Sequence, residues 1–185
     1  MNFMQRSGFL LMVLAGLSAS QAFAEPVVPG KPNVRVTGNL VADSCTLKAG
    51  DEKLDVAFLT MSNKDLYVNK RSQGKLFSLH LLDCDPDIAK ALKVTFYGDV
   101  GTELPGLLLP AIKDKDGAAG FAIGMETESG KALPFNETMP AITLDTGNNT
   151  LNFKAYVQAT PQAIEKKSVT LGEYTAIATF SLDYE

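Results

Sequence analysis

Residues 172–185 constrain the fold most, because from Ala176 onward their side chains alternate in polarity. One parity is polar, with Ile177 as its apolar exception, and the other carries Ala176, Ala178, Phe180, Leu182 and Tyr184. Successive side chains of a strand point to opposite faces, so this period of two predicts a half-buried β-strand. No later segment of the sequence can pair with its far side. It is therefore either an ordinary edge strand or a strand whose partner comes from another molecule.

Residues 1–24 have the composition of a secretory signal peptide, with Arg6, a short apolar run at 8–17 and the A-x-A site of Ala22 and Ala24. The run is shorter than the ~20 residues that cross a bilayer, so we expect cleavage after Ala24 and no membrane span in the mature chain. Removing Arg6 changes the net charge from −4 to −5. An acidic chain without a basic cluster argues against a nucleic-acid partner.

The mature chain contains two cysteines, Cys45 and Cys84. In the oxidising compartment that a signal peptide implies, an isolated pair is expected to form a disulfide. Closing a loop of this length stabilises a fold by about 4 kcal/mol in the chain-entropy model. Two cysteines and a single histidine cannot complete a zinc site.

Several further segments alternate and are separated by Gly, Pro, Asn and Asp. We expect strands at 34–40, 40–47, 75–82, 91–97, 120–127, 131–135 and 150–157, a weaker strand at 54–58, and a hairpin loop at 128–130. Only 85–91 and 161–167 suggest short helical turns. Many short strands without a long helix or an internal repeat predict a single β-sandwich.

Enzymes need a convergent set of titratable groups, and the sequence suggests none. The one histidine, His80, lies on the outward parity of an expected strand, which favours a surface role. Asp83, Asp85 and Asp87 are spaced like the start of a calcium loop. Because the glycine and distal glutamate of such a loop are missing, turn formation is favoured. We predict no enzymatic activity, no metal and no cofactor.

The segment before Cys45 has two parts. Residues 25–32 include three prolines, which keep the chain extended and outside a central strand. Residues 34–40 then alternate, with Val34, Val36, Gly38 and Leu40 on one side. This second strand, at the other end of the mature chain, could be the first strand of the sandwich itself.

Together these features resemble the structural subunits of chaperone–usher pili of Gram-negative bacteria. The shared motifs run in order: Val34-x-Val36-x-Gly38-x-Leu40, the pair Cys45 and Cys84, Phe77-x-Leu79-x-Leu81, residues 94–98 and 120–124, Phe153-x-Ala155-Tyr156, and the C-terminal Gly172 to Tyr184. The C-terminal part is most similar to the minor tip-fibrillum subunits, the linker or adaptor kind, of P-type pili.

The resemblance implies an all-β fold, an incomplete immunoglobulin-like β-sandwich of six strands that lacks strand G beside the C-terminal strand F. In this family a periplasmic pilus chaperone lends the missing strand, and at the outer-membrane usher the N-terminal extension of the next subunit replaces it. This implies a donor strand of Val34, Val36, Gly38 and Leu40. It also implies an acceptor strand of Gly172, Ala176, Ala178, Phe180, Leu182 and Tyr184.

We therefore expect a signal peptide at 1–24, a donor extension at 25–41 and a pilin domain at 42–185. The resemblance implies a subunit exported through the periplasm to a fimbrium on the cell surface, polymerised by donor-strand exchange with neighbouring subunits. Its alternative is a secreted single-domain module that binds carbohydrate or protein and folds without residues 34–40.

Overall fold

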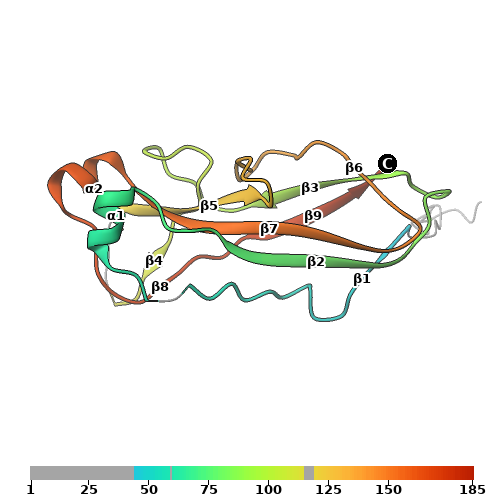
Figure 1. The fold of residues 1–185 in the computed structure, drawn as a ribbon, viewed down its shortest axis with the longest axis horizontal. Coiled ribbons are helices and arrows are strands. Elements are labelled where there is room, and N and C mark those ends of the chain that lie inside the picture. Colours follow the sequence, from blue (N-terminus) through green and yellow to red (C-terminus); the bar gives the residue numbers. More distant parts are fainter. Residues whose placement is uncertain (1–43, 59, 115–118) are drawn as a thin grey trace, which may run out of the picture. The chain divides into compact units, whose positions relative to one another are not determined.

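The computed structural model describes residues 44–58, 60–114 and 119–185 (Figure 1). The predicted signal peptide, the proline-rich segment and the four donor residues Val34, Val36, Gly38 and Leu40 lie outside the described residues. Within the described chain, no helix combines the length and the apolar composition needed to span a membrane.

Strands dominate the described residues. They are β1 (Thr46–Leu47), β2 (Lys75–Cys84), β3 (Ala91–Tyr97), β4 (Ala111–Ile112), β5 (Phe121–Thr127), β6 (Ile142–Thr143), β7 (Gly147–Ala159), β8 (Tyr174–Thr175) and β9 (Thr179–Tyr184). The helices are α1 (Asn63–Asn69) and α2 (Pro161–Lys166). The all-β prediction is confirmed.

The strand order is that of an immunoglobulin-like sandwich. One sheet has the antiparallel order β1-β2-β7-β5, which corresponds to strands A, B, E and D. The second has the order β6-β3-β9, in which β3 and β9 correspond to C and F, and β4 pairs separately with β8. In a complete immunoglobulin sheet, strand G pairs with F on the side opposite to C. Among the described strands, β9 is the edge of its sheet.

The core forms where the inward parities of the two sheets meet. Leu79 of β2 pairs with Leu151 of β7, and Phe77 pairs with Phe153. Leu79 is fully buried and Phe153 is 1 % exposed. Burying an aliphatic or aromatic side chain of this size stabilises the fold by roughly 1.5–3 kcal/mol. The alternation seen in the sequence of β2 and β7 is therefore the main source of their stability.

A disulfide joins Cys45 to Cys84 and confirms the predicted pairing. Both sulfur-bearing residues are buried, at 6 % and 3 % exposure. Beside them, the Asp85 N–H donates to the carbonyl of Ser44 at 2.7 Å. The bridge thus fixes the start of the described chain to the end of β2.

Two predicted strands are wrong. Residues 54–58 form no strand, because no described strand lies alongside them to complete a ladder. Residues 131–135 also form none, apart from a single bridge between Ala132 and Glu126. Pro134 has no N–H to donate to a ladder. The hairpin loop itself is present, closed by the Thr127 N–H donating to Lys131 O at 2.8 Å, with Gly130 at φ +88°.

The helical segments were partly predicted. α2 is confirmed, capped by the Thr160 hydroxyl, which accepts from the Ala163 N–H. At 85–91 there is a single turn instead of a helix, held by the Asp85 carboxylate, which accepts from the Asp87 N–H. The sequence analysis missed α1, which Ser62 caps and which buries only Leu66. A helix with one buried side chain leaves almost no periodicity to detect.

Candidate functional site

An open apolar groove of about 750 Å³ runs beside the last two strands. One wall is the irregular segment between β1 and α1, from residues 54 to 61 with Leu59 undescribed, and the other wall runs from Val169 to Phe180. In Figure 1, β8 lies at the end that carries α1 and α2, and β9 runs toward the opposite end. The groove therefore lies along the outer edge of β8 and the start of β9.

Among the described residues, no strand lies in the groove between its two walls, and the strands beside it each have one unpaired edge. β9 pairs with β3 on one side only, with Phe96 opposite Phe180 and Val94 opposite Leu182. β8 pairs with β4 on one side only, with Ile112 opposite Tyr174. An unpaired strand edge is a template for pairing with another chain.

The groove floor consists of core side chains from both sheets. Phe77, Phe96, Ile123, Met125 and Val157 line it, although Phe77 is only half-buried. Ring centroids of Phe96 lie 6.5 Å from Phe77 and 6.2 Å from Phe180. Apart from Phe77, these side chains are at most 7 % exposed, so the groove reaches down to the packed core and an apolar ligand placed in it would contact core residues.

The structure places four of the six predicted acceptor residues on the groove: Gly172, Ala176, Ala178 and Phe180. Gly172 has φ +147°, a backbone conformation that favours glycine. Leu182 and Tyr184 do not line the groove; they continue along β9 opposite Val94 and Leu92. The acceptor role of all six stays a prediction, as does the donor role of the residues outside the described chain.

The predicted strand from Ala176 to Tyr184 is interrupted. Residues 176–178 are not in a strand, and they separate β8 from β9. β3 ends at Tyr97, opposite Thr179, and β4 begins at Ala111, opposite Thr175, so neither offers a ladder to the residues between. Ala176 and Ala178 on either side of the break line the groove, whereas Ile177 between them does not and is 83 % exposed.

Sequence analysis missed two components of the groove. The first is the wall at 54–61, whose Leu54-x-Val56-x-Phe58 alternation was the available signal. The second is Tyr174, which lies on the same predicted strand face as Ala176 but comes before the stretch whose polarity alternates.

The Tyr174 ring is held between two other aromatic rings. Its centroid lies 5.1 Å from Phe121 and 6.4 Å from Phe58, which belongs to the opposite wall. Burial raises the pKa of Tyr174 above its ordinary value of 10.0. Its hydroxyl is buried and has no hydrogen-bond partner among the described residues.

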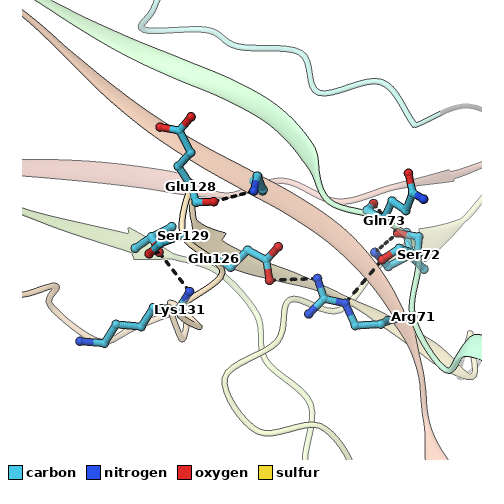
Figure 2. Close-up of polar contacts among 10 residues, drawn as sticks. Arg71, Ser72, Gln73, Glu126, Glu128, Ser129 and Lys131 are labelled. Carbon is cyan, nitrogen blue, oxygen red and sulfur yellow. Dashed lines mark hydrogen bonds and ion pairs between the residues drawn. The ribbon is translucent and has the colours of Figure 1, made fainter.

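Arg71, which lies away from the groove, has structural partners. Figure 2 shows Arg71 reaching Glu126 on β5, with the Nη2–Oε2 distance at 2.9 Å. The same guanidinium stacks 3.7 Å above the Tyr156 ring. Glu126 and Tyr156 alternate with core residues, so this cluster lies on the sheet face turned away from the core. It ties the segment before β2 to β5 and β7.

His80 is likewise bound to a carboxylate. Its Nδ1 lies 2.8 Å from Oδ2 of Asp51, which also accepts the His80 backbone N–H at 2.6 Å. Burial alone would raise the pKa of Asp51. The hydrogen bonds from His80 and its charge together outweigh this effect, so the pKa lies below the ordinary value of 3.8. This pair clamps the loop after β1 onto β2. Among described residues, no cluster of three His, Cys, Asp or Glu side chains could hold a metal.

The described residues thus form an immunoglobulin-like sandwich with an unpaired edge at the strand that corresponds to F. The family profile described as "Fimbrial protein" matches residues 34–185. The chain is 34 % identical over 185 residues to the uncharacterized fimbrial-like protein YfcP of Escherichia coli K12, covering 99 % of this chain and 98 % of that protein. It is 32 % identical over 194 residues to the fimbrial adapter PapK of Escherichia coli, covering 98 % and 99 %. The chain belongs to the fimbrial protein family.

Solved structures agree with this assignment. A chaperone–usher pilus structure matches with a TM-score of 0.64 at 25 % identity, covering 88 % of this chain and all of the other. The P pilus rod subunit PapA matches with a TM-score of 0.65 at 24 % identity, covering 77 % and 100 %, which shows a common fold. The protein is a structural pilus subunit that functions on the cell surface in contact with neighbouring subunits.

Proposed function

We propose that the chain assembles by donor-strand exchange, with its groove accepting a strand and residues 34–40 donating one to a neighbour. The groove between residues 54–61 and strands β8 and β9 carries this proposal, because it has the position of an absent strand G. Binding would be β-strand addition, in which the backbone supplies affinity and alternating pockets supply specificity. In this scheme residues 25–41 are the donor extension and 42–185 the pilin domain.

The donor residues have the chemistry that the groove requires. Burying Val34, Val36 and Leu40 would contribute roughly 1.5–3 kcal/mol each. A ladder to the exposed edge of β9 would add about 1 kcal/mol net per hydrogen bond. Gly38, which has no side chain, suits a position of close backbone approach.

The open groove also explains the remaining partners that we propose. An exposed apolar surface over core residues would cause aggregation in the periplasm unless it were covered. A periplasmic chaperone that lends a strand would cover it, and the outer-membrane usher would be the place of exchange. We propose a non-catalytic minor linker or adaptor position in the pilus, as in the relatives named fimbrial adapter PapK and putative minor fimbrial subunit PmfF.

The test uses residues 25–185, produced without a chaperone and refolded with or without a synthetic peptide of residues 33–41. We expect a weakly stable or aggregating chain that the peptide converts into a highly stable complex, measured by thermal unfolding. A Gly38→Leu peptide should stabilise much less and serves as the matched control. A chain that melts cooperatively at an ordinary temperature and ignores the peptide would instead support a self-contained binding module.

A further inference from the structure

We propose that Tyr174 fixes the register of the incoming donor strand, by lying opposite its glycine and donating a hydrogen bond to the donor backbone there. This inference rests on the proposed strand acceptance and specifies the chemistry of the donor at one position of the groove. The sequence pattern did not identify Tyr174 as a site residue.

The first observation is the buried hydroxyl of Tyr174. It has no hydrogen-bond partner among the described residues, and the tyrosine ring that carries it packs near the rings of Phe58 and Phe121. Leaving a buried hydroxyl without a partner costs free energy, and such groups are rare in folded proteins. Tyr174 lines the groove, so a strand that enters the groove can supply the missing partner.

The second observation is the order of side-chain sizes along the same wall. Among the residues that line this wall, those on the parity of Tyr174 are the large Tyr174 itself and then the small Ala176 and Ala178. Neighbouring strands of an immunoglobulin sheet are antiparallel, so a strand in the position of G would run opposite to β9. An antiparallel donor can then place Gly38, its smallest residue, beside Tyr174. In the same register Val36 lies beside Ala176 and Val34 beside Ala178.

Shifting this register by two residues removes the match. In one direction Leu40 would crowd Tyr174, and Gly38 would leave a void beside Ala176. In the other direction Val36 would crowd Tyr174, and Gly38 would leave a void beside Gly172. Cross-strand pairs of this kind determine sheet register, and cores penalise both crowding and cavities. One register therefore fits the described wall.

Glycine also explains which donor group meets the hydroxyl. The donor side chains on the groove-facing parity are aliphatic and cannot accept a hydrogen bond. At Gly38 no side chain covers the adjoining peptide groups, so a tyrosine hydroxyl can approach a backbone carbonyl. The expected acceptor is a main-chain carbonyl next to Gly38.

The experiment compares the wild-type chain of residues 25–185 with Tyr174→Phe and Tyr174→Ala. Each protein is refolded with the peptide of residues 33–41, carrying either Gly38 or Gly38→Ala, and dissociation is measured by displacement with labelled peptide. Tyr97→Phe, which removes the hydroxyl of a 44 % exposed tyrosine on β3, is the matched control. These variants separate the hydrogen bond from the fit of side-chain volumes.

We expect Tyr174→Phe to speed dissociation of the Gly38 peptide about 3- to 10-fold, the effect of losing one buried hydrogen bond, while the thermal stability of the unliganded chain is equal or higher. The Gly38→Ala peptide should dissociate faster from wild type, and Tyr174→Ala should reduce that difference. Equal dissociation from wild type and Tyr174→Phe overturns the hydrogen bond. An undiminished glycine effect in Tyr174→Ala overturns the register. Failure of every protein to bind any peptide overturns strand acceptance itself.

Discussion

Strands β7 and β9 differ in how completely the described chain surrounds them. β7 pairs with β2 on one side and β5 on the other, and its inward residues Leu151, Phe153 and Val157 are at most 7 % exposed. β9 pairs only with β3, and its inward residues Phe180 and Leu182 are half-buried. The sheet around β7 is thus completed by strands of the same chain. The sheet around β9 leaves one strand edge and two half-buried core side chains that a strand from a neighbour can cover.

Truncating a side chain in the complete half should have the largest effect. Phe153→Ala removes a ring that packs against Phe77 and Phe96 at 5.6 and 5.2 Å between centroids. We expect a loss of about 3–5 kcal/mol in the free energy of unfolding. Urea titration should show this loss both with and without donor peptide. A loss confined to the peptide complex would mean that this region too depends on the donor.

Filling the groove should affect only the complex. Ala178→Phe places a large ring where we propose a donor valine, so binding of the 33–41 peptide should weaken by about 1–3 kcal/mol. Calorimetric titration of peptide into refolded protein measures this change. Thr179→Phe, on the exposed parity of β9, is the matched control and should bind normally. Equal weakening by both substitutions would contradict the assigned face.

The smallest effect concerns pH and lies away from the groove. The lowered pKa of Asp51 means that its interactions with His80 stabilise the fold above the ordinary value of 3.8, and that this stability is lost as pH falls through the lowered value. Asp51→Asn should remove this part of the acid dependence and cost about 0.5–1 kcal/mol at neutral pH, because the amide oxygen still accepts a hydrogen bond. Urea unfolding from pH 7 to pH 3 tests both statements. An unchanged acid dependence in the variant would assign it to other carboxylates.

Period-two patterns predicted the strands that form ladders on the described chain. β2, β3, β5 and β7 were identified because their alternation reports burial on one face, and the disulfide followed from the cysteine count. The segment at 54–58 alternates as well, but a strand also needs a neighbour, which one sequence cannot reveal. Fimbrial family membership likewise depended on the order of several weak motifs.

The candidate site was less predictable than the fold. Ala176, Ala178 and Phe180 were found through their parity, whereas Tyr174 lies before the alternating stretch and β8 has only two residues. An unsatisfied hydroxyl depends on what surrounds it in three dimensions. No local pattern contains that information, and for the same reason the groove wall at 54–61 was not recognised.

The disulfide has a mechanical consequence. Tension applied through the chain before Ser44 enters the domain beside Cys45, and β1 pairs with β2 through only two residues. The Cys45–Cys84 bond carries that tension covalently into the end of β2, whose long ladder with β7 is loaded along its length. A fibre pulled by flow would then transmit force through the most completely hydrogen-bonded strands of each subunit, and the short β1 ladder would bear little of it.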